Sequence, residues 1–184
     1  MPSIDLNLLL KLKENYTNYN CFVETGTYQG ETIFNLEPYF TKLITIEFDN
    51  ILFNHTKNRY IGNKIDFILG DSSDVFKTLL PKINTNTIFF LDGHYSGGIT
   101  GRSLKDCPLI EEITCINELF NDEAILIIDD YRLFGQYIDG INWSNITKTE
   151  ILNILNTRIK YHYHLESELD NNDRLIIHIF GKNK

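Results

Sequence analysis

Carboxylates and an imidazole follow two apolar segments of the sequence, in positions suited to acid–base or metal chemistry. One segment runs into Asp92-Gly-His94, and a later one runs into Asp129-Asp130. If the segments are neighbouring parallel strands, about 4.8 Å apart, the three aspartates converge at one edge of a sheet. Carboxylates brought that close repel one another, so either one takes up a proton or a cation joins them. An all-oxygen set favours a hard cation such as Mg²⁺, Ca²⁺ or Mn²⁺, with His94 or Asp92 as the general base.

A glycine-containing turn follows the first apolar segment and suggests a nucleotide site. It reads Glu24-Thr-Gly-Thr-Tyr-Gln-Gly30, so its glycines are spaced GxxxG rather than GxGxxG. Gly26 allows a sharp turn, and Gly30 allows close approach of a ligand where the next helix begins. Glu47 ends the second segment, about 20 residues after Gly26, where a carboxylate can accept ribose hydroxyls. The third segment ends in Asp71-Ser72, which we expect to hold an adenine.

Short apolar runs alternate with helix-like segments along the chain, which predicts strand–helix units. Five such units in a row predict a parallel sheet with helices on both faces, and a late hairpin adds an antiparallel edge. We therefore expect one α/β, Rossmann-like, doubly wound domain over 1–184, with a mostly parallel seven-stranded sheet and an N-terminal helix within 1–16. The predicted strands are 21–25, 43–47, 65–69, 87–91, 124–128, 161–166 and 174–180, and the predicted helices are 4–15 (capped by Ser3), 31–40, 51–60, 72–80 (capped by Asp71 or Ser72), 108–121 and 147–157.

Composition excludes several classes of protein. The chain has 184 residues, 17 basic and 25 acidic, and a net charge of −8. An acidic domain without a basic run is a poor binder of nucleic acid or of an anionic membrane. No window is long and apolar enough to span a membrane. Three cysteines without a CxxC pattern indicate reduced thiols and a cytoplasmic protein.

The order of the turn, the acidic residue and the third-strand end resembles the class I S-adenosylmethionine-dependent methyltransferases. The resemblance runs from about Cys21 to the C-terminus, and the late hairpin matches the last two strands of that family. It implies S-adenosylmethionine as the cofactor. The cofactor-binding residues that it implies are Glu24, Thr25, Gly26, Thr27, Tyr28, Gly30, Glu47, Asp71, Ser72 and Asp92.

The LDG and DD motifs of the fourth and fifth strands resemble the metal-dependent, macrocin-type sugar O-methyltransferases. Carried over, Asp92, Asp129 and Asp130 hold a divalent cation, expected to be Mg²⁺, and His94 is the base. The loop over 93–105 is expected to close over the acceptor. Arg102 and Arg132 flank the predicted site, where they either bind a phosphate on the substrate or form surface salt bridges.

Several alternatives stay open at this stage. The acceptor is a small molecule, either a sugar or nucleotide sugar, or another vicinal diol such as a catechol. The other functions are a nicotinamide-dependent oxidoreductase, against which the missing GxGxxG counts, and a nucleotide-binding domain without turnover. The assembly, monomer or homodimer, is also open.

Overall fold

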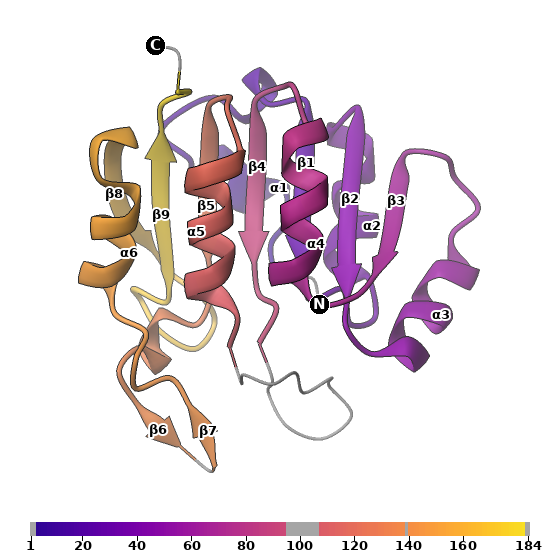
Figure 1. Ribbon diagram of the computed structural model, residues 1–184. Coiled ribbons are helices and arrows are strands. Elements are labelled where there is room, and N and C mark those ends of the chain that lie inside the picture. The colour runs from indigo at the N-terminus through magenta and orange to yellow at the C-terminus, as the bar shows by residue number, and fades with distance from the viewer. Residues whose placement is uncertain (1–2, 95–106, 139, 183–184) are drawn as a thin grey trace.

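Seven strands form one twisted sheet, and its order defines where a ligand can bind (Figure 1). The computed structural model describes residues 3–94, 107–138 and 140–182. The order is β3-β2-β1-β4-β5-β9-β8, in which β1 to β5 run parallel and β9 is antiparallel to both neighbours. Successive strands are added to one side of β1 up to β3 and to its other side from β4 onward. The switch point between β1 and β4, where this strand order reverses, is where open α/β sheets bind ligands. The strands are β1 (Cys21–Thr25), β2 (Lys42–Glu47), β3 (Ile65–Leu69), β4 (Thr87–Leu91), β5 (Ala124–Ile128), β8 (Ile159–Leu165) and β9 (Arg174–Ile179).

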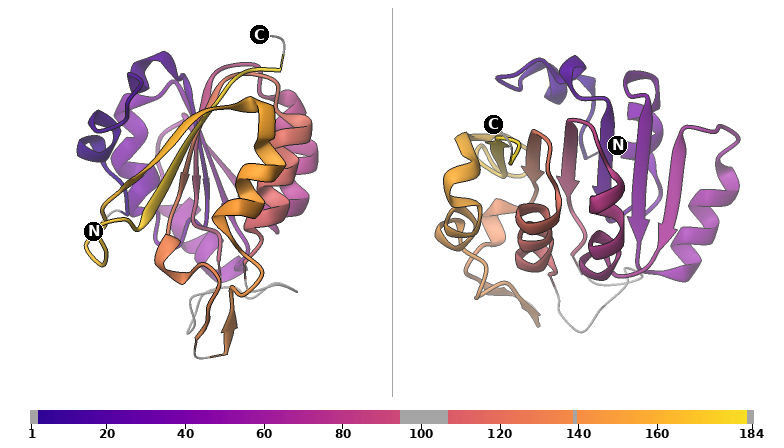
Figure 2. Two further views of the ribbon diagram at one scale, coloured as in Figure 1. Left: turned by 90° about the vertical axis from the view of Figure 1, so that its left-hand side faces the viewer. Right: turned by 45° about the horizontal axis from the view of Figure 1, so that its top comes forward.

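Helices cover both faces of the sheet, as the edge-on view shows (Figure 2). On one face lie α4, α5 and α6, and on the other lie α1 and α2. This arrangement confirms the predicted Rossmann-like, doubly wound class. The helices are α1 (Leu6–Leu10), α2 (Glu31–Leu36), α3 (Asn50–Arg59), α4 (Ser72–Leu79), α5 (Leu109–Leu119) and α6 (Lys148–Leu155), and short 3-10 turns are η1 (Tyr16–Asn18), η2 (Glu37–Tyr39), η3 (Leu80–Lys82), η4 (Tyr131–Leu133) and η5 (Asn156–Arg158).

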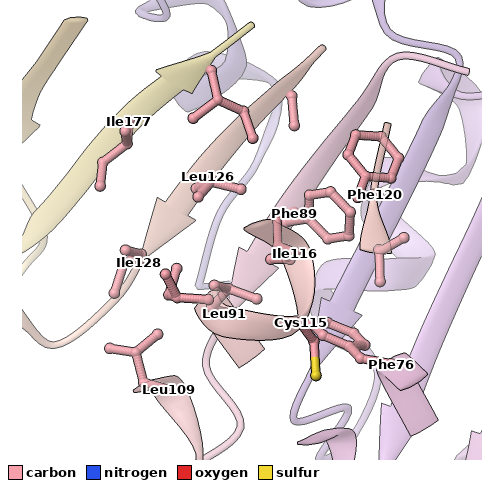
Figure 3. Packing of buried hydrophobic residues seen from close by; sticks show 14 of the residues in the cluster. Phe76, Phe89, Leu91, Leu109, Cys115, Ile116, Phe120, Leu126, Ile128 and Ile177 are labelled. Atoms are coloured by element: carbon pink, nitrogen blue, oxygen red, sulfur yellow. The ribbon is translucent and has the colours of Figure 1, made fainter. Parts of the chain in front are cut away.

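The central strands are apolar on both sides because both faces are covered. Every residue of β1, β4 and β5 is buried. Between the sheet and α4 and α5, Phe89 packs edge-on against Phe76 and Phe120 (Figure 3). This packing anchors β4, the strand that precedes Asp92 and His94, against both helices.

The N-terminal helix is much shorter than predicted. A helix over 4–15 was expected from its apolar spacing, but α1 has five residues and its cap is Asp5, which accepts a hydrogen bond from the Leu8 N–H. The chain then leaves the helix, and the Lys13 N–H donates to the Tyr163 hydroxyl on β8 instead. Ser3, the predicted cap, donates its N–H to the Thr32 hydroxyl. Contacts with the sheet and α2 therefore override the local preference for helix.

A small antiparallel hairpin, β6 (Tyr137–Ile138) with β7 (Ile141–Asn142), follows β5 and was not predicted. Two-residue strands are too short to produce a recognisable alternation in the sequence. Among the described helices, none has the length and apolar character needed to cross a membrane.

Candidate active site

The turn after β1 adopts a backbone that requires its glycines. Gly26 has φ +82°, and a Cβ there would lie 2.4 Å from the Asp92 carbonyl oxygen. Gly30 has φ +75°, and its Cβ would lie 2.5 Å from the Thr56 methyl group. Between them, Tyr28 is a non-glycine residue with φ +47° and a half-exposed ring. Such a left-handed residue stores strain and is typical of ligand sites.

Glu47 ends β2 and lies beside this turn, as predicted. Its side chain is buried; one carboxylate oxygen accepts the Tyr28 N–H at 2.8 Å and the other accepts the Asp49 N–H at 2.9 Å. Burial raises the pKa of Glu47, and the two backbone N–H groups oppose this shift. Each carboxylate oxygen has a second lone pair, so Glu47 can still accept hydroxyl groups of a ligand.

Glu24 lies under the same turn and is only 1% exposed. It accepts a hydrogen bond from Thr45 at 2.7 Å, and the Thr45 hydroxyl also contacts that of Thr27 at 2.5 Å. Burial raises the pKa of Glu24 to about 8. Near neutral pH this carboxyl is therefore largely protonated and part of a buried hydroxyl network.

We expect Glu24→Gln to reduce the pH dependence of stability. Because the pKa of Glu24 is raised from 4.5 to about 8, the folded chain holds a proton there that the unfolded chain has lost. The free energy of unfolding should then fall as pH rises from about 5 to about 8. Glutamine keeps the acceptor for Thr45 and removes the titration. Urea unfolding at about pH 6 and about pH 8 measures how much the free energy of unfolding changes with pH. The same change in wild type and in Glu24→Gln would contradict the assignment.

Asp71 and Ser72 follow the end of β3, at the same edge of the sheet as the turn after β1. Asp71 caps α4 by accepting the Ser73 N–H at 3.0 Å, which confirms one of the two predicted caps. Ser72 is buried. These residues lie beyond the carboxyl end of β3, where the predicted adenine site would be.

Asp92, His94 and Asp130 form a tight cluster beyond β4 and β5. The His94 Nδ1 atom lies 3.3 Å from Asp92, and its Nε2 atom lies 2.9 Å from Asp130. One ligand atom from each of the three residues lies within 4.8 Å of the others, so the cluster can hold a metal ion. A neutral imidazole carries one N–H and can donate to only one carboxylate, so the other contact needs a further proton or a cation.

The carboxylates in this region have very different proton affinities. Burial raises the pKa of Asp92 well above its usual range, and the charges of Asp129 and Asp130 add to the shift. Burial also raises the pKa of Asp129 to about 6, against the opposing charge of Arg174. Burial opposes ionisation of Asp130 too, but His94 and Arg132 outweigh it and lower its pKa. Asp92 is therefore the carboxyl of the cluster that holds a proton most readily.

Asp129, the third predicted metal ligand, lies beside Asp130 and is paired with Arg174. Its carboxylate is 3.4 Å from the Arg174 Nε atom, and it accepts the Asp130 N–H at 3.1 Å. The Asp130 backbone is left-handed, with φ +58°. Asp129 and Asp130 also form a second group with Asp173, whose ligand atoms lie within 4.8 Å of one another and which lines the same cavity. Asp130 therefore belongs to two described groups that can hold a cation. Arg132 forms salt bridges with both Asp130 and Asp173, which was one of the two roles predicted for it.

A cavity of about 660 Å³ opens in front of the cluster. One wall is the N-terminal segment with α1, and the other is the loop between β8 and β9. Arg174 joins the walls, because it donates to the carbonyl groups of Ser3 and Glu166. Lys11 pairs with Glu166 across the opening.

Three contributors to the site were missed in the sequence. Arg174 and Asp173 come from the hairpin near the C-terminus, and the buried Trp143 ring meets His94 edge-on at 4.9 Å between ring centres. Only the expected position of the hairpin at an antiparallel edge of the sheet hinted at the first two. Nothing in the sequence indicated the third. The predicted acceptor loop and Arg102 fall almost entirely within 95–106, outside the described residues.

Comparisons with known proteins show the fold and leave the chemistry open. No protein-family model matches the chain, and no curated protein matches its sequence. Its structure is similar to that of SMU.1697c from Streptococcus mutans, in complex with S-adenosylhomocysteine (SAH): TM-score 0.61, 14% identity, 97% of this chain and 99% of that one. It is also similar to the N-methyltransferase NodS from Bradyrhizobium japonicum WM9 (TM-score 0.59, 13% identity, 95% and 93%) and to an rRNA methylase from Streptococcus thermophilus (0.54, 15%, 89% and 88%). The chain has the Rossmann-like fold of S-adenosylmethionine-dependent methyltransferases, a fold that these neighbours share although NodS is named as an N-methyltransferase and the Streptococcus thermophilus protein as an rRNA methylase.

Proposed function

We propose that this protein is an S-adenosylmethionine-dependent O-methyltransferase that acts on a hydroxyl group of an uncharged sugar or sugar-derived molecule. The observation that carries the proposal is the position of two sites at one sheet edge. The strained turn with Glu47 lies over β1 and β2, and the cluster of Asp92, His94 and Asp130 lies beyond β4 and β5. Cofactor and acceptor would thus meet at the switch point of the sheet.

The cofactor would lie over the turn at 25–30, with Glu47 accepting its ribose hydroxyls and Asp71 and Ser72 beside its adenine. The two glycines let the turn pack closely on Asp92 and Thr56, because a side chain at either glycine would collide with these neighbours. This packing holds the backbone on which the cofactor would lie. The missing GxGxxG pattern argues against a nicotinamide cofactor.

The donor set beyond β4 and β5 fits a divalent cation. Asp92 and Asp130 would hold it through carboxylate oxygens, and Asp129, paired with Arg174, lines the same cavity. Burial is the main cause that raises the pKa of Asp92, and repulsion from Asp129 and Asp130 raises it further. A bound cation would offset that repulsion. Such a cation would favour the deprotonated form of an acceptor hydroxyl. His94 lies within reach of both carboxylates and would take the proton from that hydroxyl.

The charge of the cavity favours an uncharged acceptor over a nucleotide sugar. Among the described residues that line it, the two basic side chains are already paired, Lys11 with Glu166 and Arg174 with Asp129. A phosphate group would therefore meet carboxylates without a free cation to offset them, and that placement is costly. Neutral hydroxyl groups can instead donate hydrogen bonds to these carboxylates.

Binding of SAH, measured by calorimetry, tests the cofactor assignment. We expect wild type to bind SAH and not NAD, and Glu47→Ala to raise the dissociation constant about tenfold or more, because two charge-assisted hydrogen bonds are lost. Glu47→Gln keeps one neutral acceptor, so its dissociation constant for SAH should lie between those of wild type and Glu47→Ala. Glu150→Ala, an exposed change on α6, is the matched control.

Two outcomes would contradict the cofactor assignment. One is wild type that binds NAD in preference to SAH, which would favour an oxidoreductase. The other is a Glu47→Ala protein that is folded and binds SAH as tightly as wild type does.

A further inference from the structure

Glu112 is a buried carboxyl that the proposed chemistry does not use. It lies in the first turn of α5, its side chain is 1% exposed, and its Oε1 atom has no hydrogen-bond partner among the described residues. A buried polar atom without a partner costs folding free energy. An apolar side chain of similar size would avoid that cost, so the carboxyl needs a reason beyond packing.

The carboxyl lies directly against the floor of the proposed cofactor site. A Cβ built on Gly93 would be 3.3 Å from Oε1 and 3.0 Å from the Thr25 hydroxyl. That hydroxyl in turn receives the Asp92 N–H at 3.3 Å. Burial raises the pKa of Glu112 to about 7, against the opposing effect of the Ser72 and Thr25 hydroxyls. Glu112 thus joins the ends of β1 and β4 with the start of α4.

The described basic side chains near the site are engaged elsewhere. Arg174 pairs with Asp129, and Arg132 pairs with Asp130 and Asp173. Among the described residues no basic side chain pairs with Glu112, and the charge that acts on its pKa is the like charge of Asp71. A positive charge bound over the floor of the site would therefore interact with a carboxyl that lacks a counter-ion.

We propose that Glu112 is a positioning residue that makes the site prefer the positively charged cofactor, S-adenosylmethionine, over its uncharged product, SAH. The inference depends on the proposed function and deepens it. The two ligands differ by the methyl group and by the charge on sulfur, so a buried carboxylate nearby acts on one of them more than on the other. In a site of low effective dielectric constant this attraction persists over several ångströms. Loss of the charge upon methyl transfer then weakens binding of the product and aids its release.

The ratio of the two dissociation constants, SAH over S-adenosylmethionine, tests this role. Calorimetry on the full chain should show that Glu112→Gln lowers the ratio about fivefold, through weaker binding of S-adenosylmethionine. Binding of SAH should change by less than about twofold. Glu112→Asp, which keeps the charge, should retain most of the wild-type ratio. Glu118→Gln removes an exposed charge from the same helix and should leave the ratio unchanged.

The outcomes separate charge from packing. The residue only supports the fold, and the proposal is wrong, if Glu112→Gln weakens the binding of both ligands equally. The same holds if Glu112→Asp lowers the ratio of dissociation constants as much as Glu112→Gln does. An unchanged ratio in a folded Glu112→Gln protein also overturns it. Wild type that binds neither ligand would overturn the proposed function itself, whereas wild type that binds both leaves that function standing whatever the ratio shows.

Discussion

Asp92→Asn should lower kcat for methyl transfer by about a hundredfold or more while the SAH dissociation constant changes about threefold or less, because the carboxylate acts on the developing charge of the acceptor. Asp92 lies between the two sites: its carbonyl packs against Gly26, and its carboxylate faces His94. Asparagine preserves the shape and the backbone contacts and removes the negative charge. The variant should also be at least as stable as wild type, since burial and the charges of Asp129 and Asp130 already disfavour ionised Asp92.

The comparison with neighbouring carboxylates makes this test specific. Asp130→Asn should lose activity to a similar extent and should also be less stable than wild type. The Asp130 carboxylate forms ion pairs with His94 and Arg132, and these lower its pKa. Asp129→Asn should lose less activity, since the Arg174 guanidinium already offsets the charge of Asp129. The exposed Asp66→Asn is the control.

Activity measured across a titration with Mg²⁺ after treatment with EDTA completes the experiment. Full activity in excess EDTA would contradict a required cation and leave the carboxylates as a base and its neighbours. Wild-type kcat in Asp92→Asn would contradict the site itself.

His94→Ala should reduce kcat by about 10²- to 10⁴-fold, the range expected when a general base is removed. Its imidazole is only 10% exposed and is held on three sides, by Asp92, Asp130 and the edge of the Trp143 ring. Such a fixed orientation suits proton transfer from an acceptor bound in the adjoining cavity, which His94 lines. SAH affinity and Mg²⁺ affinity should stay close to wild type.

Parallel measurements of kcat, KM and metal affinity separate the possible roles of His94. A raised KM with unchanged kcat would mean that the ring only positions the acceptor. A large loss of Mg²⁺ affinity would make it a metal ligand instead of the base. His55→Ala, an exposed histidine of α3, is the control.

Much of the fold was predictable because covered parallel strands have a strong local signature. Continuous apolar runs such as Ala124–Ile128 read as strands in the sequence and are strands in the structure. The alternation of strands with helices then predicted the doubly wound order and the adjacency of β4 and β5. The predicted length of the N-terminal helix was wrong, because residues on either side of α1 form contacts with α2 and β8 that no local pattern reveals.

By itself, the sequence determined which residues stand at the carboxyl ends of the strands. Glu47, Asp92 and Asp130 follow apolar segments, and strand geometry requires the ends of parallel neighbours to share one edge. The tertiary structure decided which of these side chains meet. The Asp130 carboxylate lies 2.9 Å from the His94 ring, a contact between the ends of two different strands. Partners from distant segments, such as Arg174 for Asp129, then balance charges that the sequence presented as one acidic group. Such pairing depends on side-chain direction and long-range packing, which the spacing of residues along a chain does not contain.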